Sequence, residues 1–195
     1  MMDDQFSGTR FRLYPQAPEV DDDGQPETVY VSSPAGSLGP GPQDARMYAV
    51  NTVGKQQHYG MHKTGAGEPN LFLPPWGGEI HMPPEPGPDG HFDHLEPGTP
   101  QFDAAHLFGA ARFTLDVWER YFDRPSAWHC GEDFDRLELS IMPAVDNAFM
   151  GWGFLEAGAA FEDGASRPYW LNFDVIAHEI GHGIIYSEVG MPVDD

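Results

Sequence analysis

The stretch Phe173–Gly183 reads FDVIAHEIGHG and carries more information about the fold than any other part of the chain. His178 and His182 are four residues apart, so on a helix their side chains project from one face, about one turn apart. Most of their neighbours are uncharged, which is typical of a helix that is buried on its other side. The pattern predicts a helix that begins near Asn172 and runs toward Ser187.

This helix also carries the pattern of a metal centre. Two imidazoles on one helix face can bind a single ion, and zinc is the ion that this motif favours. Glu179 follows the first histidine, close enough to reach a water on the metal without being a ligand. Zinc lowers the pKa of such a water, and the carboxylate can take its proton. We therefore expect His178 and His182 to be zinc ligands and Glu179 to be the catalytic base.

A second, longer helix is predicted upstream, over residues 103–122. Apolar residues recur there at steps of three and four, Asp103 suits the N-cap, and Pro125 closes the far end. We interpret His106 as a residue on the surface of this helix. Strand patterns follow at 137–142, 147–150 and 154–157. The whole predicts an α+β fold in which antiparallel strands pack on the long helix and on the helix with the two histidines.

The first half of the chain differs in composition, since residues 1–100 hold 15 of the 19 prolines and 14 of the 23 glycines. Such a segment favours turns and short strands, which we expect at 28–32, 47–50 and 71–73. The acidic composition of the first 25 residues favours disorder. We therefore divide the chain into a Pro/Gly-rich, extended region, 1–100, and a region that carries the chemistry, 101–195.

The histidine motif resembles the zinc helix of the thermolysin-like peptidases, the gluzincin group of metallopeptidases. The likeness covers Phe173–Gly183 and includes Asp174, four residues before the first histidine. Upstream, the stretch 146–149, Asp-Asn-Ala-Phe, resembles the Asn-Ala-Phe edge strand of that family. The resemblance implies the N-terminal lobe of such an enzyme over roughly residues 100–190, zinc as the cofactor and a peptide or protein as the substrate. It also implies that Asn147 and the carbonyl of Ala148 contact the substrate backbone.

The resemblance further implies a third zinc ligand, a glutamate roughly twenty residues beyond the second histidine. Only 13 residues follow His182, so this position, and the second lobe of the family, lie beyond Asp195. Three alternatives are open. A second chain, or a further part of a longer protein, supplies the ligand, which is the account we favour. Otherwise Glu188 is the third ligand, or Asp194 or Asp195 folds back to the metal.

The charge of the chain limits its partners. The formal net charge is −21 and the sequence pI is about 4.4. Such a field repels nucleic acid and acidic membrane surfaces, so we expect neither as a partner. The sequence has no visible membrane span and no Sec signal peptide, which favours a cytoplasmic location unless export follows another route.

Two further histidine pairs fall in predicted loops. His58 and His62 are four apart in a Gly-rich segment, and His91 and His94 flank an acidic residue. We interpret both pairs as solvated loop residues rather than as metal ligands.

The function that these patterns favour is zinc-dependent hydrolysis of peptide bonds by a metalloendopeptidase. The alternative is a noncatalytic protein of the same fold that binds zinc or a protein partner. That alternative is open because the sequence contains neither the third ligand position nor the second lobe of the family.

Overall fold

The computed structural model describes residues 8–18, 20, 24–162 and 165–191. Within these residues the elements follow in the order β1 (Gly8–Leu13), β2 (Glu27–Pro34), β3 (Met47–Asn51), β4 (Gly60–Lys63), β5 (Pro69–Phe72), α1 (Pro100–Phe122), β6 (Leu137–Ile141), β7 (Ala148–Met150), β8 (Phe154–Ala157), β9 (Ala159–Glu162), β10 (Ala165–Pro168), the short 3-10 helix η2 (Tyr169–Leu171) and α2 (Phe173–Val189). Helices combined with several small sheets make this a mixed α+β protein, as the sequence predicts.

The central element is a four-stranded sheet in the order β3-β6-β8-β7. β3, β6 and β8 are parallel to one another, whereas β7 runs antiparallel to β8. The expectation of antiparallel strands is therefore wrong for most of this sheet, although the hairpins β1–β2, β4–β5 and β9–β10 are antiparallel. β3 comes from the Pro/Gly-rich half and places Met47 opposite Leu137 of β6. The two compositional regions thus share one sheet.

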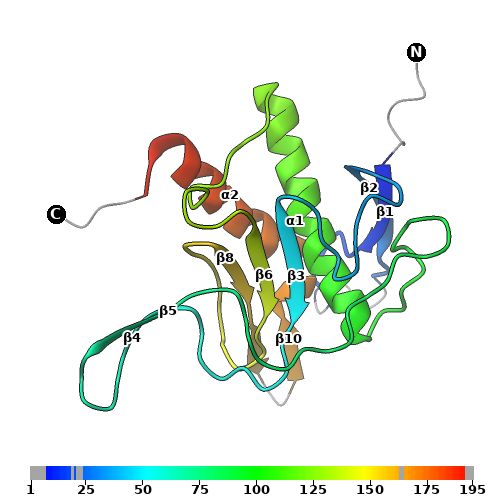
Figure 1. The fold of residues 1–195 in the computed structure, drawn as a ribbon. Coiled ribbons are helices and arrows are strands. Elements are labelled where there is room, and N and C mark those ends of the chain that lie inside the picture. Colours follow the sequence, from blue (N-terminus) through cyan, green and yellow to red (C-terminus); the bar gives the residue numbers. More distant parts are fainter. Residues whose placement is uncertain (1–7, 19, 21–23, 163–164, 192–195) are drawn as a thin grey trace.

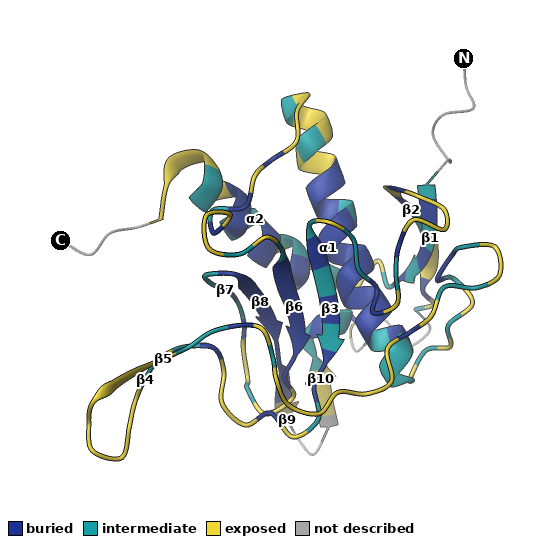
Figure 2. Ribbon diagram, in the orientation of Figure 1, coloured by how far each residue is buried: buried dark blue, intermediate teal, exposed yellow. Residues whose placement is uncertain are grey.

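Both helices pack on the sheet, and the core lies between these layers. α1 contacts β3 and β6, α2 contacts β7 and β8, and the two helices contact each other (Figure 1). The hairpin β1–β2 also packs on α1. Figure 2 shows β6, β8 and much of α1 as buried. The core includes Phe108, Leu115, Leu139, Leu155, Ile176 and Ile180.

The start of α1 differs from the prediction. Thr99 is the N-cap, because its hydroxyl accepts a hydrogen bond from the backbone N–H of Phe102 at 3.1 Å. Pro100 occupies the beginning of the helix, where its fixed φ is favourable and its missing N–H has no cost. Asp103 lies in the first turn instead. The assignment of Asp103 as the N-cap is therefore wrong by one turn.

The first 25 residues include an ordered strand, so the prediction of disorder is wrong for β1. Phe11 and Leu13 alternate inward along β1 and belong to the main core. They reach α1 at Gly109, where a Cβ atom would lie 3.0 Å from side-chain atoms of both. A glycine at this point of the helix allows the close approach of the strand. Residues 1–7, 19 and 21–23 of the same segment lie outside the described residues.

The second face of the sheet carries a buried charged cluster. Strand alternation turns Glu138 and Glu156 away from the helices, because their neighbours along β6 and β8 belong to the core. Lys55, 2% exposed, forms an ion pair with Glu156. Burial lowers the pKa of Lys55, and the bond to Glu156 opposes that effect. Glu138 accepts hydrogen bonds from the hydroxyls of Tyr48 and Tyr59, each at 2.7 Å. These contacts attach the segment before β4 to the sheet.

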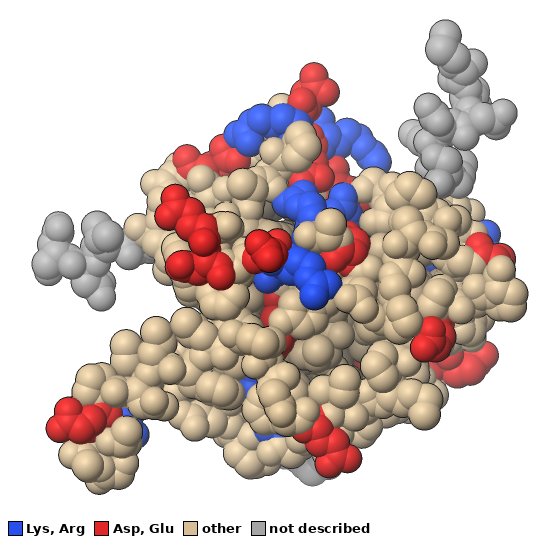
Figure 3. All heavy atoms as spheres, viewed as in Figure 1, with Lys and Arg blue, Asp and Glu red and all other residues tan. Residues whose placement is uncertain are grey.

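Charged residues at the surface are largely intermixed. On the face drawn in Figure 3, Lys and Arg atoms lie beside Asp and Glu atoms rather than in a patch of their own. Among the ion pairs of the described residues, Arg112 with Asp116 at 2.8 Å is buried, whereas Arg124 with Glu188 at 2.5 Å is more exposed. Among the described residues, neither helix has an apolar stretch long enough to span a lipid bilayer.

Candidate metal centre

The helix predicted from the histidine motif is α2, and its ends are set by local signals. Asn172 caps the beginning, with its side chain accepting a hydrogen bond from the N–H of Val175 at 3.2 Å. Gly190 caps the end with a φ of 90°, a value that glycine adopts without strain. The expected start near Asn172 is confirmed, and the helix continues two residues beyond Ser187, to Val189.

His106 of α1 contacts the segment that precedes α2. His106 is completely buried, so its interpretation as a surface residue is wrong. Its Nδ1 donates to the carbonyl of Trp170 in η2 at 2.8 Å, and its Nε2 accepts from the N–H of Tyr14 at 3.0 Å. Burial lowers the pKa of His106 to about 4. One turn earlier, burial raises the pKa of Asp103 to about 6.

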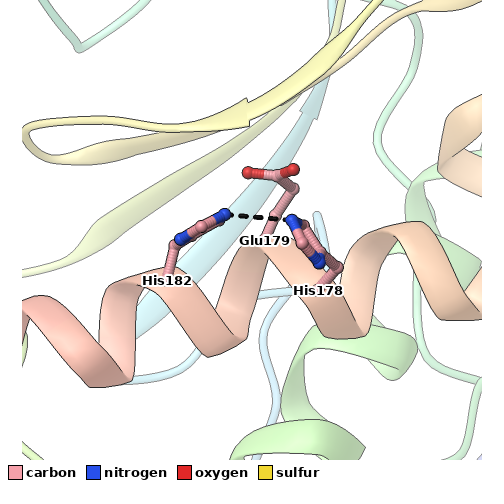
Figure 4. Close-up of side chains that lie close together, drawn as sticks. All are labelled: His178, Glu179 and His182. Carbon is pink, nitrogen blue, oxygen red and sulfur yellow. Dashed lines mark hydrogen bonds between the residues drawn. The ribbon is translucent and has the colours of Figure 1, made fainter.

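His178, Glu179 and His182 lie together, as the motif predicts. Figure 4 shows the two imidazoles and the carboxylate projecting from the same side of α2 toward the strands. The Nε2 atoms of the two histidines are 3.0 Å apart, and one ligand atom from each of the three residues falls within 4.8 Å of the others. In the described part of the chain, no other set of three His, Cys, Asp or Glu side chains comes together in this way.

This geometry fits a zinc ion bound by both imidazoles. Two ligands about 2.0–2.1 Å from a tetrahedral zinc are separated by roughly 3.3 Å, close to the observed spacing of the Nε2 atoms. Two facing imidazole nitrogens also need a proton or a cation between them, because lone pairs at this distance repel each other. His182 is supported from behind by Tyr186, whose ring stacks on it with centroids 5.7 Å apart.

Glu179 is held in place by the edge strand β7. Its Oε2 accepts a hydrogen bond from the N–H of Met150 at 2.8 Å, and the residue is 8% exposed. Burial raises the pKa of Glu179, whereas the bond from Met150 and the charges of the two histidines act in the opposite direction. Oε2 is thus fixed by the backbone, and Oε1 is the oxygen left to accept a proton.

A pocket of about 400 Å³ opens beside His178 and Glu179. It is lined by Asn147, Ala148, Tyr169, Asp174, Val175, His178 and Glu179. The structure therefore brings the two residues implied as substrate contacts, Asn147 and Ala148, next to the histidine motif. β7 is the last strand of the sheet, so its outer side has no neighbouring strand within the described residues.

Sequence reasoning did not find Tyr169 as a member of this pocket. Tyr169 precedes α2 in η2, and its hydroxyl donates to Asp146 at 2.9 Å, just ahead of β7. A single tyrosine in a short segment carries no periodic signal, so only the folded chain could identify it. This contact joins the beginning of the edge strand to the beginning of the metal helix.

The structure does not bring Glu188 to the histidine pair. Six residues beyond His182, a side chain on a regular helix is rotated by about 240° from it. Glu188 accordingly pairs with Arg124 at 2.5 Å, away from the pocket. Asp194 and Asp195, the other candidates within the chain, lie outside the described residues.

Comparison of the chain with protein-family models gave no match, and comparison with curated proteins gave none either.

Proposed function

We propose that this chain hydrolyses peptide bonds with a zinc ion held by His178 and His182. The observation that carries the proposal is the 3.0 Å separation of their Nε2 atoms beside the buried carboxylate of Glu179. Bound zinc lowers the pKa of a water molecule and polarises a carbonyl, which is the chemistry that amide hydrolysis needs. The α+β arrangement would then be that of the N-terminal lobe of the thermolysin-like peptidases.

Glu179 is the proposed general base. Its Oε2 is already occupied by the N–H of Met150, so Oε1 receives the proton and later delivers it to the leaving amine. The fixed Oε2 also keeps the side chain in one rotamer, which reduces the reorganisation needed for proton transfer.

The edge strand β7 is the proposed support for an extended substrate. The N–H of Met150 points away from β8, toward Glu179. Backbone groups of antiparallel strands alternate in direction, so Ala148 directs its N–H and C=O to the same open side. An extended peptide can add to such an edge through main-chain hydrogen bonds, with Asn147 at the end of the pairing.

A noncatalytic zinc-binding or partner-binding protein is the second candidate. The observation in its favour is that the described residues contribute two histidines and Glu179 to the centre, whereas Glu188 is paired with Arg124. Catalytic zinc sites usually have three protein ligands and one water. A partner chain that supplies the third ligand would reconcile this count with catalysis.

Measurement of bound zinc together with cleavage of an unfolded protein such as casein tests the proposal. We expect wild type to bind zinc at His178 and His182 and to cleave, His178→Ala to lose the zinc of this centre together with cleavage, and Glu179→Gln to keep that zinc without cleavage. Glu179→Gln retains an oxygen for the bond from Met150, so the fold is preserved. Glu188→Gln is the matched control and should keep both properties. Zinc binding without cleavage in wild type would favour the noncatalytic protein. Absence of zinc from this centre in wild type would overturn zinc-dependent hydrolysis and the zinc-binding form of the second candidate.

A further inference from the structure

The hairpin β4–β5 projects from the body of the protein and carries the other close pair of histidines. Figure 1 shows it extending beyond the sheet, and Figure 2 shows it as mostly exposed. The hairpin starts from a rigid base, because Tyr59 is buried and its N–H donates to Glu156 at 2.7 Å. His58 directly precedes this residue, and His62 lies within β4.

The two imidazole rings lie close together at the beginning of the hairpin. Their centroids are 4.5 Å apart, compared with 4.6 Å for His178 and His182. The ring of His58 also packs edge-to-face on Phe149 of β7, with centroids 5.5 Å apart. The centroid spacing of the α2 pair therefore recurs next to the same edge strand, with the rings tilted by 51° rather than 87°.

Backbone contacts fix the tautomer of each ring. Nδ1 of His58 lies 2.5 Å from the carbonyl oxygen of Tyr59, and Nε2 of His62 lies 2.7 Å from the carbonyl oxygen of His58. A carbonyl oxygen only accepts, so these two nitrogens carry the hydrogens. Nε2 of His58 and Nδ1 of His62 are then left with free lone pairs. Histidines that bind metals are commonly oriented in this way, through a hydrogen bond from the nitrogen that does not bind.

We propose that His58 and His62 form a second site, for a divalent transition ion, that holds the hairpin against β7. Imidazole pairs select Cu²⁺, Ni²⁺ and Zn²⁺ over hard ions such as Mg²⁺ and Ca²⁺. With two protein ligands the remaining positions belong to water, so the site binds more weakly than a centre with three. The proposal does not depend on the function of the α2 centre, because the two sites share no residue.

Titration with Cu²⁺, the ion of highest affinity in the divalent series, tests the second site. Bound copper is counted by calorimetry, and electron paramagnetic resonance reports the coordinated nitrogens. We expect His58→Ala and His62→Ala each to lose one bound ion relative to wild type, and His178→Ala to lose a different one. His81→Ala, at an exposed histidine outside both pairs, is the matched control and should lose none.

Hydrogen exchange of the hairpin supplies a second measurement. Copper should slow the exchange of amides in 60–63 and 69–72 in wild type and in His178→Ala, but not in His62→Ala. If His58→Ala and His62→Ala bind as many ions as wild type, the second site does not exist. If they lose an ion but hairpin exchange is the same with and without copper in wild type, the proposed role of the ion in holding the hairpin is wrong.

Discussion

The buried His106 and the partly buried Asp103 are expected to affect stability in opposite directions below neutral pH. They lie one turn apart on α1, where burial lowers the pKa of His106 from 6.5 to about 4 and raises that of Asp103 from 3.8 to about 6. The perturbations are His106→Gln and Asp103→Asn, each of which removes one titrating group. Both keep a polar side chain of similar size.

The magnitude follows from the separation of the folded and unfolded pKa values. Below pH 6.5 the unfolded chain protonates His106, whereas the folded chain does not until about pH 4. The stability due to neutral His106 is therefore complete above pH 6.5 and is lost as the pH falls to about 4. At about 1.4 kcal/mol per pH unit, this loss amounts to about 3 kcal/mol.

The stability contribution of Asp103 depends on pH in the opposite direction. Its folded pKa lies above its unfolded value, so its contribution is complete below pH 3.8 and is lost as the pH rises to about 6. This change is also about 3 kcal/mol. In wild type the changes in the two stability contributions nearly cancel between pH 4 and 6. Each substitution removes one of them, so that the pH dependence due to the other group becomes measurable.

Urea denaturation of the three proteins from pH 4 to pH 7 measures these terms. The free energy of unfolding of each variant is compared with that of wild type at the same pH, because the contributions of the other acidic groups then cancel. We expect the stability of His106→Gln relative to wild type to rise by about 3 kcal/mol as the pH falls from 6.5 to 4. That of Asp103→Asn should rise by a similar amount as the pH increases from 4 to 6. Differences that stay constant with pH for both variants would refute the reasoning.

Three further predictions concern the buried ion pair, two glycines and the metal. Lys55→Met should lower the free energy of unfolding by about 3–5 kcal/mol, because it leaves Glu156 buried without its charged partner. The double variant Lys55→Met with Glu156→Gln should recover much of this lost stability in the same urea assay. Gly181→Ala should stabilise α2 by about 1 kcal/mol, since nothing lies within 4 Å of the added Cβ. Gly158→Ala should instead lower the melting temperature strongly, because its Cβ would lie 1.8 Å from a backbone carbonyl oxygen. A chelator should lower the melting temperature of zinc-loaded wild type more than that of His178→Ala, and equal shifts in both would place the stabilising metal elsewhere.

The features that local sequence determines were predicted well. The boundaries of α2 follow from Asn172, Gly190 and the apolar periodicity between them, all within one segment. The proximity of His178, Glu179 and His182 is a property of that same helix, so it required no knowledge of the tertiary fold. Asn147 and Ala148 were indicated by a family resemblance, and the structure places them in the same pocket.

The features that depend on distant contacts were not predicted. Residues of β6 are buried on both faces, and such a strand carries no alternation that distinguishes parallel from antiparallel neighbours. His106 looked like a surface residue because its partners, Tyr14 and Trp170, come from segments far away in the sequence. β1 lies among acidic residues, and its inward side chains become evident only through their contacts with α1.

The parallel pairing of β3 with β6 determines the order in which the chain can acquire its structure. β3 leaves the ribosome long before β6, since Met47 pairs with Leu137, and such non-local pairing forms slowly. Until β6 is made, β3 lacks its partner in the central sheet and would present an open edge to other chains. A net charge of −21 would help to keep these unfinished chains apart during synthesis.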